Sequence, residues 1–423
     1  MSDYRAMWEN LGINMPRHDM LMNALPAIYD KTYLHQPDRP QGMGFYDFVV
    51  SEIHGLRVQE LVQHKEKGGK VFGTFCVYAP EEVIIAGGGI AVGLCGGADF
   101  SVPTAEQILP RNLCALIKSA VGFKLGGICP YFQVADLIVG ETTCDGKKKT
   151  WEIVDDYVPT YVMDLPNSRT AADRQLWIGE LERFVGKVEE MTGNTVTPER
   201  LAQSTELLNR KRAALRRLYV LRQARPAPIS GLDALLVTQI SFYDDPARFT
   251  QKTNELCDEL EARVRVGQRV APASAKRVLY AGTPMPIPFW TIPSLIERTG
   301  AVMIAEESCT GTRLVAGGET AVPGDGLGGQ LAAIADRQLQ TNCACFTPNP
   351  ARIEDILKLA KDYRADGVVH FSLSFCQPYN LEGVRVQRAL EQAGIPVLLL
   401  EGDYSEEQAG QLKTRIEAFV ETL

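Results

Sequence analysis

The hydrophobic positions of the chain fall into short, nearly continuous apolar runs that alternate with longer amphipathic stretches. Four runs lie in the first half, at residues 71–75, 90–94, 136–141 and 160–165, and four in the second, at residues 277–281, 301–308, 366–375 and 395–403. Such runs are typical of parallel strands buried on both faces, and the stretches between them are typical of covering helices. The pattern predicts an α/β protein with two parallel sheets.

Two further regions lack these runs and carry apolar residues at helical spacing instead. They divide the chain into an N-terminal helical segment (1–68), a first α/β domain (69–168), a helical region (169–268) and a second α/β domain (269–423). The length of 423 residues suits two or three domains of roughly 100–200 residues each.

The two predicted sheets follow the same order of strands and helices. Cys144 and Cys376 fall just beyond the third strand of each, and Cys95 and Cys309 just beyond the second. Open α/β sheets place their ligand sites at the carboxyl ends of the strands, and sites often lie between domains. The sequence therefore predicts two flavodoxin- or Rossmann-like domains that face each other across a cleft lined by cysteines.

Composition and charge argue against some classes of function and partner. The chain is 45% hydrophobic and 23% charged, as in soluble globular proteins, and its net charge is −8. An acidic balance argues against nucleic acid or an anionic membrane as a partner. The N-terminus lacks the pattern of a signal peptide, and no apolar run reaches the ~18 residues of a membrane span. We expect a cytoplasmic protein without a membrane partner.

The ten cysteines require an explanation, because a reducing cytoplasm disfavours structural disulfides. Buried thiols are one interpretation, and it suits Cys257, within an amphipathic helix, and Cys95. Ligation of a metal or cluster is the other interpretation. It suits the cysteines that stand with Gly, Pro, Asp and Thr at segment ends, namely Cys76, Cys114, Cys129, Cys144, Cys309, Cys343, Cys345 and Cys376. On the residues alone, both interpretations stay open.

The spacing of these eight cysteines favours a cluster over a zinc knuckle. Thiolates select zinc, copper(I) or iron–sulfur clusters. A structural zinc site uses close cysteine pairs, and the only close pair here is Cys343 and Cys345. Cys114 lies near the start of an expected helix over residues 103–122, where backbone amides favour a thiolate.

Five motifs resemble the 2-hydroxyacyl-CoA dehydratase/benzoyl-CoA reductase superfamily, and within it the double-cubane cluster proteins. They are FCVYAPEEVIIAGGG, LPRNLCALIKSAVGF, ADLIVGETTCDGKKKTWE, NCACFTPNPAR and DGVVHFSLSFCQPYN. In the heterodimeric dehydratases, three cysteines of a subunit hold one 4Fe-4S cluster, and Cys76, Cys114 and Cys376 match them. Since the other thiols exceed what one such cluster needs, the resemblance implies an 8Fe-9S double cubane held by six cysteines.

The resemblance also implies an anaerobic iron–sulfur oxidoreductase, a homodimer that reduces a small molecule at low potential. Its electrons would come from a separate homodimeric ATPase with its own 4Fe-4S cluster, and the chain has no GxxxxGK[ST] loop. Two alternatives stay open. One is a 2-hydroxyacyl-CoA dehydratase subunit, a lyase with a single 4Fe-4S cluster, and the other is a non-enzymatic cluster or zinc carrier.

Two polar residues near the predicted cleft are candidates for proton transfer. His370 lies within an apolar strand, where a satisfied core histidine is the alternative. Glu141 precedes Cys144, and hydrogen bonding to loop amides is the alternative there.

Overall fold

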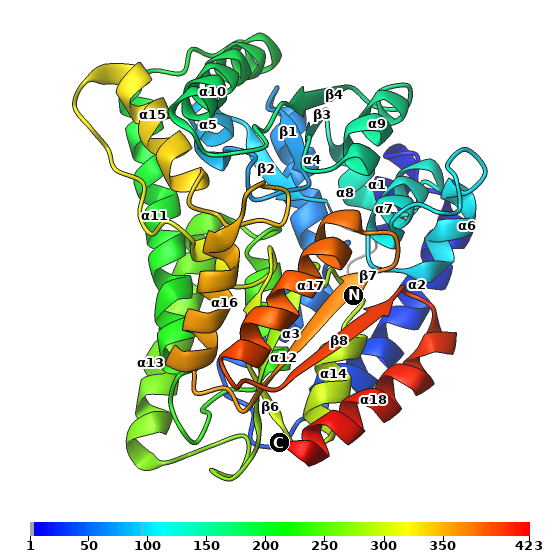
Figure 1. The fold of residues 1–423 in the computed structure, drawn as a ribbon. Coiled ribbons are helices and arrows are strands. Elements are labelled where there is room, and N and C mark those ends of the chain that lie inside the picture. The colour runs from blue at the N-terminus through cyan, green and yellow to red at the C-terminus, as the bar shows by residue number, and fades with distance from the viewer. Residues whose placement is uncertain (1–3, 95) are drawn as a thin grey trace.

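The computed structural model describes residues 4–94 and 96–423 and contains two parallel sheets of four strands each (Figure 1). The first sheet has the order β2-β1-β3-β4, and its strands are β1 (Val71–Thr74), β2 (Ile90–Gly93), β3 (Leu137–Glu141) and β4 (Thr160–Met163). The second has the order β6-β5-β7-β8, and its strands are β5 (Arg277–Gly282), β6 (Val302–Glu307), β7 (Gly367–Leu373) and β8 (Val397–Gly402). All eight predicted strands are confirmed, within three residues at each end.

The two sheets share one topology, which confirms the prediction of a plan used twice. In each unit the first strand pairs with the second and the third, so that Val71 is opposite Ile90 in one sheet and Arg277 is opposite Val302 in the other. Every residue of β1, β3, β5, β6 and β7 is buried. Burial on both faces explains why these strands read as continuous apolar runs.

The helices of the first unit differ from the prediction in one place. They are α5 (Glu81–Ala86), α6 (Val102–Ala105), α7 (Ala115–Leu125), α8 (Pro130–Val134) and α9 (Asp145–Val154). The single helix predicted over 103–122 is wrong, since α6 and α7 are separated by turns over 106–114. Pro110 lies in that segment, and proline lacks an amide donor and disfavours helix in the residue before it.

The helices of the second unit are α14 (Thr291–Arg298), α15 (Gly326–Gln338), α16 (Pro350–Asp362), α17 (Gln377–Gln392) and α18 (Ala409–Thr422), with a short 3-10 turn, η3 (Thr312–Val315), after β6. The carboxyl ends of β6 and β7 therefore run into η3 and α17. Helices α14, α16, α17 and α18 pack against the second sheet, whereas α15 packs against α10 (Ala171–Thr192) and α11 (Pro198–Leu221).

The remaining helices join the two units. The N-terminal ones are α1 (Arg5–Asn10), α2 (Met15–Tyr29), α3 (Met43–Ser51) and α4 (Leu56–Glu66), and the central ones are α10 (Ala171–Thr192), α11 (Pro198–Leu221), α12 (Gly231–Ile240) and α13 (Pro246–Val266). Thr197 caps α11, since its side-chain oxygen accepts a hydrogen bond from the Arg200 amide. Helix α11 contacts α5 of the first unit and α15 of the second (Figure 1). The central helices thus fix the two sheets relative to each other.

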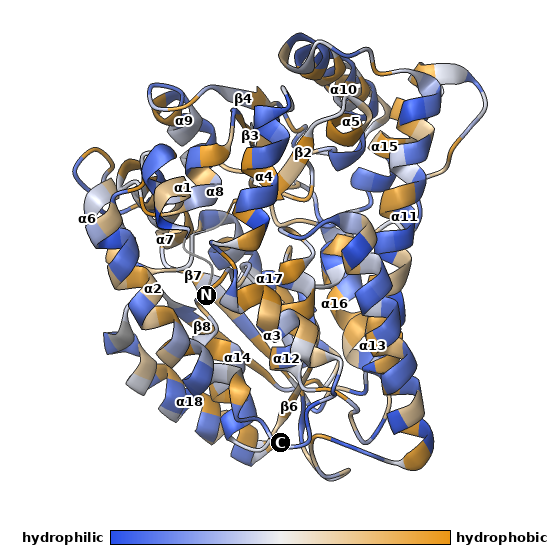
Figure 2. Ribbon diagram, turned by 180° about the vertical axis from the view of Figure 1, so that it is seen from behind, coloured by the Kyte–Doolittle hydropathy of each residue, from blue (hydrophilic) through white to orange (hydrophobic). Residues whose placement is uncertain are grey.

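The core is continuous between the units. One cluster of buried side chains includes Val92 of the first sheet and Val369 of the second. The outer helices carry hydrophilic and hydrophobic residues around their axes, as Figure 2 shows for α11 and α18. Among the described residues, no helix combines the length and the apolar character that crossing a membrane requires.

Candidate functional site

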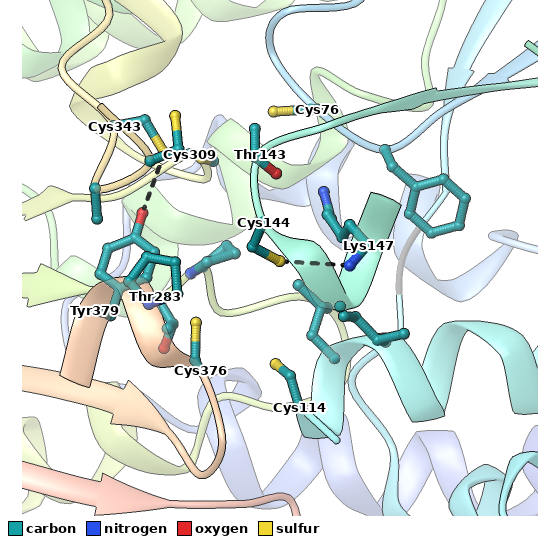
Figure 3. Close-up of a pocket in the computed structure, with 18 of the residues that line it drawn as sticks. Cys76, Cys114, Thr143, Cys144, Lys147, Thr283, Cys309, Cys343, Cys376 and Tyr379 are labelled. Carbon is teal, nitrogen blue, oxygen red and sulfur yellow. Dashed lines mark hydrogen bonds between the residues drawn. The ribbon is translucent and has the colours of Figure 1, made fainter. Parts of the chain in front are cut away.

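A cavity of about 560 Å³ lies at the carboxyl ends of both sheets (Figure 3). Its lining includes seven of the eight candidate cysteines, namely Cys76, Cys114, Cys144, Cys309, Cys343, Cys345 and Cys376. The volume is in the range of small-molecule sites. The first unit contributes three of these thiols and the second contributes four, so the site needs both copies of the repeated plan.

Three of the lining cysteines stand at helix N-termini. Cys144 follows β3 and caps α9, and Cys376 follows the equivalent strand β7 and caps α17. Cys114 caps α7, after the turns that interrupt the predicted helix. The free amides and the dipole of a helix N-terminus favour a negative charge. These three cysteines form the three-thiol group.

The three-thiol group combines thiols of both units. The hydrogen bond with Cys376, and then the amides of Leu116 and Ile117, lower the pKa of Cys114 to about 7. The same thiol–thiol interaction raises the pKa of Cys376. The Lys147 amide donates to Cys144 Sγ at 3.4 Å. Of Cys114 and Cys376, the first thus has thiolate character and the second keeps its proton.

The other four lining cysteines, Cys76, Cys309, Cys343 and Cys345, form the four-thiol group. The interaction between the thiols of Cys76 and Cys309 raises the pKa of the first and lowers that of the second. The interaction between Cys343 and Cys345 lowers the pKa of Cys343 to about 5 and raises that of Cys345. Cys345 is also under the electrostatic influence of Cys76 and Cys309, which links the two pairs on one side of the cavity.

Charged side chains stand directly behind the thiols. The Arg313 guanidinium donates to Cys309 Sγ at 3.7 Å. The hydroxyl oxygen of Tyr379 lies 3.9 Å from Cys343 Sγ (Figure 3). Lys147 lines the cavity, and its ammonium group forms an ion pair with the buried carboxylate of Glu141. The walls therefore carry fixed positive charge as well as thiols.

Arg313 and Tyr379 were not identified from the sequence. Both stand within four residues of a candidate cysteine, since Arg313 follows Cys309 and Tyr379 follows Cys376. That proximity is the signal that could have pointed to them.

Two of the described cysteines do not line the cavity. Cys129 occupies the N-cap position of α8 and lines an adjacent, smaller pocket, which shares Leu94 and Tyr243 with the cavity. Cys257 is fully buried on α13, as the buried-thiol interpretation predicts, and its thiol faces the Ala214 carbonyl oxygen at 3.9 Å. Cys95 lies outside the described residues.

Neither candidate for proton transfer is among the described residues that line the cavity. His370 is buried within β7, and burial lowers its pKa to about 3. Glu141 is also buried, at the end of β3, and it reaches the cavity through Lys147. One oxygen of the Glu141 carboxylate, Oε2, has no hydrogen-bond partner in the described part of the chain.

The thiols are spread around the cavity rather than gathered at one point. Within residues 4–94 and 96–423, no three His, Cys, Asp or Glu side chains converge closely enough to hold a single metal ion. A polynuclear cluster accepts thiolates on several irons and so can bridge thiols from separate segments. The donor set and its distribution fit such a group.

The family model described as 2-hydroxyglutaryl-CoA dehydratase, D-component, matches residues 76–423. A protein of Escherichia coli (strain K12) named as a dehydratase subunit, YjiM, is 38% identical over 411 residues, which cover 95% of this chain and 100% of that protein. The (R)-phenyllactyl-CoA dehydratase beta subunit of Clostridium sporogenes is 24% identical over 86% of this chain and 94% of its own length. One of the subunits of benzoyl-CoA reductase from Thauera aromatica is 22% identical over 74% of this chain and 80% of its own length.

Proposed function

We propose that this chain, which belongs to the 2-hydroxyglutaryl-CoA dehydratase D-component family, is the iron–sulfur component of an ATP-dependent reductase. In this proposal it holds an 8Fe-9S double-cubane cluster and reduces a small molecule at low potential. The observation that carries the proposal is the cavity into which two copies of one fold direct seven thiols, in a group of three and a group of four.

The thiol groups match the needs of two joined cubanes. The three-thiol group of Cys114, Cys144 and Cys376 would hold one half, and three of the four remaining thiols would hold the other. A bound cluster of this kind supplies single electrons at low potential. The chain's own contribution is to hold the sulfurs around the cavity of about 560 Å³ and to limit the molecule that is reduced to the space that the cluster leaves free.

The walls also suit an anionic group. Three helices, α7, α9 and α17, point their N-termini at the cavity, and helix N-termini stabilise nearby anions. The ammonium group of Lys147 adds positive charge, which its ion pair with Glu141 holds in place. Amide donors at the sulfur of a thiolate ligand influence the reduction potential.

Other proteins would complete the system. Several relatives are named as subunits, among them subunits of benzoyl-CoA reductase and of 2-hydroxyglutaryl-CoA dehydratase, which suggests that this chain also acts with partners. We propose a homodimer that receives electrons from a separate homodimeric ATPase with a 4Fe-4S cluster. The absence of a GxxxxGK[ST] loop from the sequence agrees with an ATP site on another protein.

Iron and sulfide content test the proposal. The protein is purified under strict exclusion of oxygen, and iron, acid-labile sulfide and the visible spectrum are measured. About eight irons per chain are expected, since each cubane has about four. A colourless protein that contains zinc only would refute the proposal.

A dehydratase subunit with one 4Fe-4S cluster is the second candidate, and the names of several relatives favour it. It predicts about four irons per chain and turnover of a 2-hydroxyacyl-CoA substrate with a partner subunit. The double-cubane proposal predicts electron uptake from the ATPase without that substrate. Iron content and an anaerobic reduction assay with ATP and the ATPase therefore separate the two.

A further inference from the structure

The guanidinium group of Arg313 lies directly behind the four-thiol group. Arg313 belongs to η3, four residues after Cys309, and its side chain is 4% exposed. Its Nη1 donates to Cys309 Sγ at 3.7 Å and also to Tyr379 Oη. That phenol oxygen lies 3.9 Å from Cys343 Sγ. A single cation therefore reaches two of the four thiols, one directly and one through a phenol.

A buried network holds this guanidinium in place. Arg313 Nε donates to Glu307 Oε1 at 2.6 Å, and the other oxygen of Glu307 accepts from Arg352 at 2.8 Å. Arg352 in turn donates to Glu382 at 2.6 Å and is fully buried. The network contains two cations and two anions, but the group nearest the sulfurs is the cation of Arg313. Arginine remains protonated at every relevant pH, so this charge is constant.

The three-thiol group has a different environment. The Lys147 amide donates to Cys144 Sγ, and the amides of Leu116 and Ile117 at the start of α7 help to lower the pKa of Cys114. In the part of the chain that the structure describes, no guanidinium or ammonium group donates a hydrogen bond to these three sulfurs. The Lys147 ammonium group forms an ion pair with Glu141 and acts on Cys114 and Cys144 through its electrostatic field, without a hydrogen bond to either sulfur. The two thiol groups therefore differ in the hydrogen bond from a buried cation, which among the described residues reaches only the four-thiol group.

We propose that Arg313 is a positioning residue that selectively raises the reduction potential of the cluster half held by the four-thiol group. The inference rests on the proposed function. A fixed cation at hydrogen-bonding distance of a ligand sulfur stabilises the more negative, reduced state. Because burial weakens solvent screening, the electrostatic effect of the Arg313 charge decreases less steeply with distance than it would at the surface. It is still largest at the nearest sulfurs.

The chain offers a matched control in Arg222. It is 2% exposed, and it pairs with Glu306, which also accepts from Tyr219 Oη at 2.8 Å. Glu306 and Glu307 are consecutive residues of β6, so their side chains leave the strand on opposite faces. Arg222 therefore belongs to the same kind of buried Arg–Glu–Tyr set, but it donates to none of the described cavity thiols.

Redox titration of the iron-loaded protein, followed by electron paramagnetic resonance, tests the inference. We expect the two cluster halves to titrate as two components. In Arg313→Gln, the one-electron equilibrium of the component from the four-thiol half should shift at least tenfold toward the oxidised state, which lowers its reduction potential by about 59 mV. The other component should shift less. Arg313→Lys keeps the charge and should shift less than Arg313→Gln, and Arg222→Gln should leave both potentials unchanged. Unchanged potentials in Arg313→Gln, or equal shifts of both components, would overturn the inference.

A second variant covers the case in which Arg313→Gln loses iron. Tyr379→Phe removes only the link from Arg313 to Cys343 and should lower the same component's potential by a smaller amount. If both potentials stay unchanged in iron-loaded Tyr379→Phe, the inference is wrong. The iron content of the unaltered protein tests the proposed function separately. An iron-free protein would refute that function independently of any result on Arg313.

Discussion

The unequal numbers of thiols lead to an asymmetric response to cysteine replacement. Cys114→Ala leaves two thiols in the three-thiol group, whereas Cys345→Ala leaves three in the four-thiol group. Of the pair Cys343 and Cys345, we expect Cys345 to be the spare thiol. The Tyr379 hydroxyl lies 3.9 Å from Cys343 Sγ and links that sulfur to Arg313, whereas no hydrogen-bond donor of this kind contacts Cys345 among the described residues.

The size of the effect follows from the ligand count. If each half needs three cysteines and contains about four irons, Cys114→Ala should lower the content from about eight to about four irons per chain. Cys345→Ala should keep about eight, because three thiols remain in its group. Acid-labile sulfide and the visible absorbance of the cluster should fall in proportion to iron in the first variant and stay constant in the second.

Cys257→Ala provides the control for replacing a buried thiol. Cys257 is fully buried on α13 and lies outside the cavity, so its loss should cost about 1 kcal/mol of stability but no iron. Full iron content in Cys114→Ala would refute the assignment of the three-thiol group. Equal losses of iron in Cys114→Ala and Cys345→Ala would refute the idea of a spare thiol.

Three further predictions concern stability and are measured on the apoprotein. Burial lowers the pKa of His18 to about 4 and of His54 to about 3, against 6.5 in the unfolded chain, so both rings are neutral in the fold. The contribution of these two histidines to stability should be complete above pH 6.5 and fall by about 1.4 kcal/mol per pH unit and histidine as the pH drops toward 4, and denaturation midpoints of the unaltered protein and of the variant without both histidines measure it by difference. Lys147→Met should lower the unfolding free energy by about 3–5 kcal/mol, because it leaves the Glu141 carboxylate buried without its ion pair, and adding Glu141→Gln should restore most of the loss. Gly311→Ala should cost about 3 kcal/mol, since its Cβ would stand 2.1 Å from the Glu306 carbonyl oxygen, and thermal unfolding measures the loss.

Each of these predictions has a control and a contradicting result. For the histidines, a variant with both replaced by Gln should show a shallower pH dependence between 4 and 6.5, because His370, whose pKa burial lowers to about 3, keeps its own contribution; retention of the full slope contradicts the reasoning. For the ion pair, additive losses in the double variant would show that Lys147 and Glu141 are independent. For the turn, Gly328→Ala in α15 has open space at its Cβ and should gain about 1 kcal/mol of helix propensity. Equal effects of the two glycine replacements would contradict the proposed clash.

The strands and their order could be predicted because burial on both faces leaves a direct trace in the sequence. The run at 366–375 became β7 (Gly367–Leu373), and Cys144 and Cys376 stand beyond equivalent strands, as the pattern of the repeat requires. Local sequence also indicates helix starts, such as Pro130 after Cys129. These signals depend on neighbours in the chain, which the sequence contains.

The partners of each thiol could not be predicted, because they depend on how the units are joined. Cys76 of the first unit interacts with Cys309 of the second, and Cys114 interacts with Cys376, across more than 200 residues of sequence in each case. Cys129 shows the limit clearly. It caps a helix as Cys114 does, yet it lines a different pocket, and no local feature distinguishes the two.

The repeat also shows how two equivalent walls can differ in charge. Cys95-Gly96-Gly97-Ala98-Asp99 follows β2, and Cys309-Thr310-Gly311-Thr312-Arg313 follows β6, so Asp99 and Arg313 occupy equivalent positions at the start of short 3-10 turns. Asp99 is exposed, whereas Arg313 is buried and donates to Cys309. A duplicated fold that supplied identical walls would hold both halves of a cluster at similar potentials. The exposed acid Asp99 in the first unit and the buried cation Arg313 at the equivalent position in the second make the two walls different in charge. Arg313 lies on the side of the cavity that also carries the additional thiol of the four-thiol group.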